Sequence, residues 1–153
     1  MVGNHCMSLK EQLNEAMKQA MKARDDLRLS AVRMVRSTVK NREIELKHEL
    51  DDQGVIEVIS TMVKQRHESI RLYQDGNRQD LVDKEEAEIA ILFQFLPAQM
   101  NRDEIAELVS RTIRETGAQG IKEMGKVMKS LTTLTAGRAD GKIVSEIVRQ
   151  QLA

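Results

Sequence analysis

The stretch Phe93-Gln94-Phe95-Leu96-Pro97-Ala98-Gln99-Met100-Asn101 contains the only proline of the 153-residue chain. Proline lacks a backbone N–H and disfavours the α conformation in the residue before it, so a preceding helix is expected to end at Leu96. Asn101 is a favourable N-cap for a new helix because Glu104 follows it at capping-box spacing. The sequence therefore predicts a hinge at this stretch, between domains that cover residues 7–97 and 98–153.

The composition indicates an all-α protein. Hydrophobic residues make up 41% and charged residues 31% of the chain, as is usual for a globular domain. Aromatic residues make up only 2%, and the 9 methionines favour helices packed through flexible aliphatic side chains over a β-sandwich. No apolar run approaches the length of about 20 residues that spans a bilayer, and no signal-peptide pattern is present. We expect a cytoplasmic protein with no membrane contact.

An N-terminal domain of about four helices is expected before the proline. Ser8, Asp25 with Asp26, and Asp80 are suitable N-caps for three of them. The apolar residues recur at helical spacing, which identifies the faces expected to be buried. Those faces comprise Leu9, Leu13, Ala16, Met17, Ala20 and Met21; then Leu27, Ala31, Met34, Val35, Thr38 and Leu46; then Val55, Val58, Ile59, Met62, Val63, Ile70 and Tyr73; and finally Leu81, Ile89, Leu92, Phe93 and Leu96.

Three shorter helices are expected after the proline, forming a small bundle. Gly117 is placed to end the first as a C-cap, and Asp140 is placed to cap the last. Gly125 lies in the middle helix, where we expect it to permit close approach of another backbone. The faces expected to be buried comprise Ile105, Leu108, Val109, Thr112 and Ile113; then Met124, Val127, Met128 and Leu131; and then Val144, Ile147, Val148 and Leu152.

Arg66 interrupts the apolar face of the third helix. It lies four residues after Met62 and four before Ile70, so its side chain is expected at or near the core. A buried guanidinium requires a carboxylate partner. Glu85 and Glu88 of the following helix are the expected partners, and the role of all three is predicted to be structural.

Basic residues are concentrated in two parts of a chain whose formal net charge is zero, namely residues 7–49 and 117–153. In the first part, four of them fall close together on the side of the second helix opposite its apolar face. This pattern is typical of a solvated outer face, and contact with RNA or a protein partner is the functional alternative. The four residues are Arg33, Arg36, Lys40 and Lys47.

No catalytic, metal or cofactor site is predicted. Glu85 and Glu88 lack the histidine of a Glu-x-x-His arrangement, so the structural role is preferred for them. The segment 120–127 resembles a phosphate-binding loop, but Val127 replaces the hydroxyl that would hold magnesium and no strand precedes it. His5 and Cys6 have no further ligands nearby to complete a zinc site. Residues 1–6 carry no helical pattern and are interpreted as a non-native or disordered leader.

The chain contains a series of short motifs on both sides of the proline. They are Arg66-x-x-Ser69, Gly76-x-Arg78-x-Asp80-Leu81, Glu85, Glu88, Leu92, Leu96-Pro97-x-Gln99, Met124-Gly125-Lys126-Val127-Met128 and Gly137-Arg138-x-Asp140-Gly141-x-x-Val144. With these motifs the chain resembles the GatB/YqeY family from about Met7 to the C-terminus, and it is identified as YqeY-like. Two small departures are Asn77, between a glycine and an arginine that are usually adjacent in the family, and Phe95, where tyrosine is common.

The resemblance implies a helical N-terminal domain followed by a three-helix domain similar to the tail of the B subunit of tRNA-dependent amidotransferase. A tRNA-binding accessory module is the first hypothesis, a helical adaptor for a synthetase or amidotransferase component is the second, and a carbon–nitrogen ligase that uses glutamine is the third. The enzyme hypothesis is the weakest because no nucleophile and base pair is present. The residues expected to contact tRNA phosphates are Lys122, Lys126, Lys129, Arg138 and Lys142.

Overall fold

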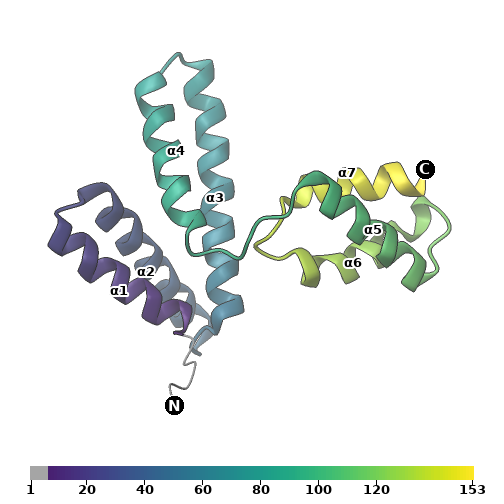
Figure 1. The fold of residues 1–153 in the computed structure, drawn as a ribbon, viewed down its shortest axis with the longest axis horizontal. Coiled ribbons are helices and arrows are strands. Elements are labelled where there is room, and N and C mark those ends of the chain that lie inside the picture. The colour runs from purple at the N-terminus through teal and green to yellow at the C-terminus, as the bar shows by residue number, and fades with distance from the viewer. Residues whose placement is uncertain (1–6) are drawn as a thin grey trace. The chain divides into compact units, whose positions relative to one another are not determined.

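The computed structural model describes residues 7–153, which are helical with connecting turns, confirming the all-α prediction (Figure 1). The chain divides into two compact units, the first ending at Leu96 and the second running from Pro97 to Ala153. The interpretation of residues 1–6 as a leader lies outside the described residues.

The first unit consists of two helical hairpins. The first hairpin pairs α1 (Leu9–Ala23) with α2 (Asp26–Leu46), and the second pairs α3 (Asp52–Asp75) with α4 (Gln79–Phe93) (Figure 1). α2 also contacts α3 and α4, which joins the hairpins through one core. That core contains, among others, Leu13, Val32, Val35, Val39, Val55, Ile59, Val82, Ile89, Leu92 and Phe95.

Local sequence signals explain where these helices begin. Ser8 and Glu11 form a complete capping box at the start of α1, and the side chains of Asp25 and Asp51 accept backbone N–H bonds at the starts of α2 and α3. The prediction of Asp80 as a cap is wrong. Arg78 holds the N-cap position of α4, and the Asp80 carboxylate accepts hydrogen bonds from its guanidinium.

Part of the predicted burial in α2 is also wrong. Leu27, Met34 and Leu46 are exposed. The buried stripe of α2 instead consists of Ala31, Val32, Val35 and Val39. Because α2 packs against α1 as well as the second hairpin, its buried stripe lies between these neighbours and differs from the face suggested by the larger apolar residues.

Two smaller differences concern the ends of α1 and α4. Met21 is 51% exposed, although it lies at the spacing of the buried face of α1. α4 ends at Phe93, earlier than the predicted Leu96, and the chain then turns so that Phe95 is buried while Phe93 is exposed. This early end is consistent with the effect of Pro97 on the residues that precede it.

The second unit is a three-helix bundle with one additional 3-10 turn. It contains α5 (Arg102–Thr116), η1 (Ile121–Glu123), α6 (Met124–Thr135) and α7 (Gly141–Leu152). Asn101 and Asp140 cap α5 and α7 as predicted, and Gly117 ends α5 with a φ of 70°. The core comprises Ile105, Val109, Val127, Leu131, Val144, Ile147, Val148 and Leu152.

Gly125 does not have the packing role predicted for it. It is exposed on α6, and a Cβ atom added to it would meet no heavy atom within 4 Å. No other backbone approaches α6 closely at this position. The expectation that Gly125 is needed for close packing is therefore wrong.

The segment that enters the second unit is hydrogen-bonded to the turn between α6 and α7. The backbone N–H of Met100 donates to the carbonyl of Arg138 at 2.8 Å, and the Gln99 side-chain amide donates to the carbonyl of Gly137 at 2.6 Å. Arg138 Nε in turn donates to the carbonyl of Ala98 at 3.2 Å. The residues directly after Pro97 are therefore held as part of the bundle.

Candidate nucleic-acid interface

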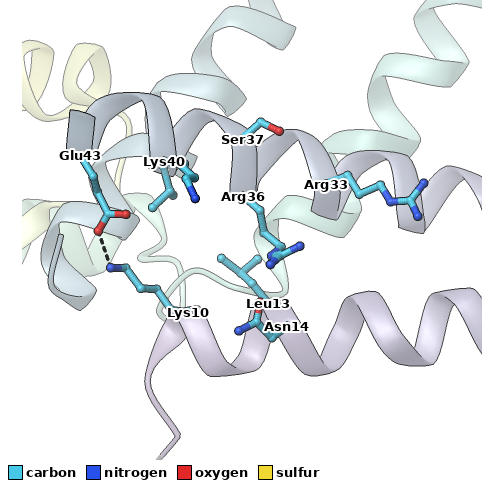
Figure 2. Close-up of a pocket in the computed structure, with 9 residues that line it drawn as sticks. Lys10, Leu13, Asn14, Arg33, Arg36, Ser37, Lys40 and Glu43 are labelled. Atoms are coloured by element: carbon cyan, nitrogen blue, oxygen red, sulfur yellow. Dashed lines mark hydrogen bonds and ion pairs between the residues drawn. The ribbon is translucent and has the colours of Figure 1, made fainter. Parts of the chain in front are cut away.

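A groove of about 420 Å³ lies between α1 and α2 (Figure 2). Its lining includes four cationic side chains and one carboxylate, so its formal charge is strongly positive. The lining residues are Lys10, Leu13, Asn14, Arg33, Arg36, Ser37, Val39, Lys40 and Glu43.

The register of α2 explains how its cations come together. Arg33, Arg36 and Lys40 recur at intervals of three and four residues, which places them along one side of a helix. In Figure 2, Arg36 extends from α2 toward α1, while Arg33 extends in another direction further along the helix. Among the described residues, none of these three cations forms an ion pair.

The fourth cation, Lys10, comes from α1 and was not part of the sequence prediction. Its ammonium group pairs with the carboxylate of Glu43 on α2, as Figure 2 shows. The same carboxylate accepts the backbone N–H of Leu50 at 2.7 Å. The hydrogen bond from Lys10, together with that from Leu50, holds the pKa of Glu43 below its ordinary value of 4.5. This network connects α1, the end of α2 and the following loop.

The groove therefore contains three of the four residues predicted as a basic face. The fourth, Lys47, is the C-cap residue of α2 with a φ of 59° and does not line the groove. An antiparallel helical hairpin brings the start of its first helix beside the end of its second. That general rule was the signal by which Lys10 could have been found.

The lysines predicted to contact tRNA are exposed in the second unit. Lys126 and Lys129 lie three residues apart on α6, Lys122 lies in the preceding η1 turn, and Lys142 lies in the first turn of α7. Within residues 7–153, none of these four forms an ion pair. Their charges are therefore available to an external anion.

Arg138, the fifth predicted contact, has a different environment. Its guanidinium binds the carbonyl of Ala98, and it lines a hollow of about 300 Å³ together with Glu104, Glu107 and Arg111. None of the four lysines lines this hollow. The hydrogen bond from Arg138 Nε joins the turn before α7 to the entering segment, and the prediction that Arg138 contacts phosphate stays a prediction.

Arg66 is buried and contacts both carboxylates that the sequence indicated. Its Nε lies 2.9 Å from Glu88 Oε2 and 3.8 Å from Glu85 Oε2. Its other nitrogens face the carbonyl of Met62 at 3.4 Å and the sulfur of Met34 at 3.1 Å. The guanidinium therefore links α3 to α4 and contacts α2.

Metal binding and membrane crossing are two further possibilities for residues 7–153. No three His, Cys, Asp or Glu side chains in this part of the chain are placed to hold a metal ion. Nor does any of its helices combine the length and the apolar character needed to cross a membrane.

Comparison with known proteins gives one family and a group of fungal relatives. The model of the family described as Yqey-like protein matches residues 10–152.

Proteins named "Altered inheritance of mitochondria protein 41, mitochondrial" are similar over a shorter region. The one from Vanderwaltozyma polyspora is 39% identical over 85 residues, which cover 55% of this chain and 46% of that protein. The one from Kluyveromyces lactis is 42% identical over 81 residues, covering 52% and 44%. The matched region thus spans about half the length of these relatives.

Proposed function

The chain belongs to the YqeY-like protein family, and from this premise we propose that it is an accessory module that binds tRNA through the phosphate backbone. The observation that carries the proposal is the set of exposed lysines on η1 and α6, namely Lys122, Lys126 and Lys129, which have no carboxylate partner within the described residues. Cations of this kind gain free energy by releasing the counterions condensed on RNA.

The mode of recognition follows from the side chains that the chain offers. Aromatic residues are scarce, at 2% of the chain, so a platform for stacking unpaired bases is not expected. Lysine contacts to phosphates fix the position of an RNA without reading its sequence. We therefore propose binding to the folded body of tRNA with little discrimination among tRNA sequences, and a cytoplasmic location remains part of this proposal.

The test is tRNA binding by the full chain over a range of salt concentrations. Lys126→Glu with Lys129→Glu should lower the affinity and reduce the slope of log K against log salt by about 1.5, because two phosphate contacts are lost. Arg114→Glu with Arg149→Glu, on α5 and α7 of the same unit, makes the same change in charge and should have a smaller effect. Unchanged affinity and slope in the lysine variant, with native helical content, would refute the proposal.

A helical adaptor for another protein is the second candidate. The observation that favours it is the exposure of large apolar side chains, with Ile44 67% and Leu72 72% exposed. Isolated exposed apolar residues are common on proteins and do not by themselves indicate an interface. Capture of a synthetase or amidotransferase component from cell extract by the wild-type chain, but not by an Ile44→Glu, Leu72→Glu variant, would favour this candidate. The carbon–nitrogen ligase hypothesis rests on family association alone.

A further inference from the structure

We infer that the groove between α1 and α2 is a second phosphate-binding site, which holds a run of backbone phosphates of the same folded RNA. This inference rests on the proposed function and adds a second contact surface, in the first unit of the chain. Its basis is the cationic lining of the groove, where Arg33, Arg36 and Lys40 have no ion-pair partner among residues 7–153.

The internal salt bridge shows which charges the groove can offer. Glu43 is the only carboxylate in the lining, and it is occupied by Lys10 and by the backbone N–H of Leu50. It therefore neutralises Lys10 of α1 at one end of the groove and acts on Lys40 only through space, while Arg33, Arg36 and Lys40 form no ion pair among residues 7–153. Three such charges beside one another repel, and an anionic ligand relieves that repulsion.

The spacing of these cations favours a chain of phosphates over a single one. Residues 33 and 40 are about 10 Å apart along the helix axis, at 1.5 Å per residue. The side chain of Arg33 extends in a different direction from that of Arg36 in Figure 2. A single phosphate would therefore meet only part of the site, whereas a nucleic-acid strand presents successive charges along its length.

The floor of the groove favours RNA over an acidic peptide. Its apolar residues are Leu13 and Val39, which are only 1% and 5% exposed because they belong to the core. An occupant can therefore gain charge pairing and hydrogen bonds, but it can bury little apolar surface. Peptide ligands depend strongly on apolar anchors. A phosphate backbone needs none, and the forked guanidinium groups of arginine suit phosphate oxygens.

The experiment measures binding of the full chain to a mixed tRNA pool and to an RNA hairpin. Two variants alter the groove: Arg36→Gln with Lys40→Gln, and Arg36→Glu with Lys40→Glu. The neutral pair should reduce affinity about 30-fold at 0.1 M salt and lower the log–log salt slope by about 1.5, since each contact contributes about 0.7 to 0.9 to that slope. The reversed pair should reduce affinity further.

The matched control is Lys64→Glu with Arg71→Glu, two exposed cations on α3 outside the groove. It makes the same change in net charge as the reversed groove pair, so an equal loss of affinity in both would overturn the inference by showing a general charge effect. Circular dichroism should show native helix content in every variant. The neutral pair introduces no new charge, which keeps the test decisive if the reversed pair fails to fold.

The remaining outcomes separate this inference from the proposed function. If Lys126→Glu with Lys129→Glu weakens tRNA binding while the neutral groove pair binds like wild type, the groove inference is wrong and the proposed function stands. If wild type binds neither RNA, the groove inference and the proposed function both fail.

A competition experiment identifies the class of ligand. Displacement of RNA by polyglutamate at equal charge concentration, but not by tripolyphosphate, would assign the groove to an acidic peptide and overturn the inference.

Discussion

Arginines of the first unit occupy two contrasting environments, one buried and paired with carboxylates and the other exposed and unpaired within the described residues. At the contact of α3 with α4, Arg66 is 8% exposed and has Glu85 and Glu88 beside it. In the groove between α1 and α2, Arg33 and Arg36 are exposed and have no ion-pair partner within the described residues.

This difference indicates which charges maintain the fold and which remain available to a ligand. Removing a guanidinium from water requires nearby carboxylates, so a buried and paired arginine is committed to the packing around it. An exposed arginine pays no such desolvation cost and contributes little to stability, whether or not it is paired. Substitution should therefore lower stability at the buried arginine and change stability little at the exposed arginines of the groove.

The largest effect is expected for Arg66→Met. The substitution leaves two carboxylates in a largely buried position without their cation, which should lower the free energy of unfolding by about 3 to 5 kcal/mol. Urea denaturation followed through Tyr73, the only tyrosine in a chain that lacks tryptophan, reports on the first unit. The matched control, Arg33→Met in the groove, should change stability by less than about 0.5 kcal/mol. An equal loss of stability in the two variants would contradict the proposed difference between the buried and the exposed arginines.

Two glycines of the second unit show a similar contrast. The backbone conformation requires glycine at one position and does not require it at the other. Gly117 has a φ of 70° at the end of α5, whereas Gly125 lies within α6 with open space around it. Gly125→Ala should stabilise the unit by about 0.5 to 1 kcal/mol, because alanine favours the helix. Gly117→Ala should destabilise it by about 1 kcal/mol, because a Cβ is strained at positive φ.

Hydrogen exchange of backbone amides in α5, α6 and α7 measures the stability of this unit separately from the first. A loss of protection in Gly125→Ala would show that α6 does need a glycine, which would restore the packing role suggested by the sequence. A gain of stability in Gly125→Ala with a loss in Gly117→Ala would show that backbone conformation, like charge burial, decides which positions tolerate substitution.

The smallest effect is expected at Glu43, which is paired but not deeply buried and so lies between the two environments. Its pKa is lowered in the folded protein by Lys10 and Leu50, so the carboxylate stabilises the fold above its ordinary pKa of 4.5. That stabilisation is lost as the pH falls through the lowered value. Melting temperatures of wild type and Glu43→Gln should therefore differ at pH 7 and converge in acid. A difference that persists in acid, where the carboxylate is protonated, would assign the effect to packing instead of charge.

Much of the fold follows from local signals in the sequence. The caps at Ser8, Asn101 and Asp140 predict helix starts because their side chains supply partners for free N–H groups. The apolar spacing of α7 predicts its buried face fully, since that short helix is strongly amphipathic. The face of α2 was harder to predict, because its apolar residues point in several directions and tertiary contacts decide which are covered.

The candidate interface was predicted less well, for a geometric reason. The cations of α2 could be identified because they share one helix and one spacing. Lys10 was missed because it lies 33 residues from Glu43 in the sequence, and only the pairing of α1 with α2 brings the two side chains together. Arg138 was included among the phosphate contacts because its type and position suited them, whereas its hydrogen bond to Ala98 depends on how the turn folds back.

The left-handed turns of the first unit have a consequence for engineering its heat resistance. Within residues 7–96, three residues other than glycine have positive φ: Arg24 at 54°, Lys47 at 59° and Asn77 at 55°. A side chain in this conformation costs about 1 kcal/mol, less for asparagine, and glycine avoids that cost. Glycine also loses more backbone freedom on folding, so replacing Arg24 and Lys47 should together gain about 1 kcal/mol, a useful fraction of the 5 to 15 kcal/mol by which typical domains are stable. Glycine at these two helix ends offers a route to a more thermostable protein that leaves the core, the groove and the lysines of α6 unaltered.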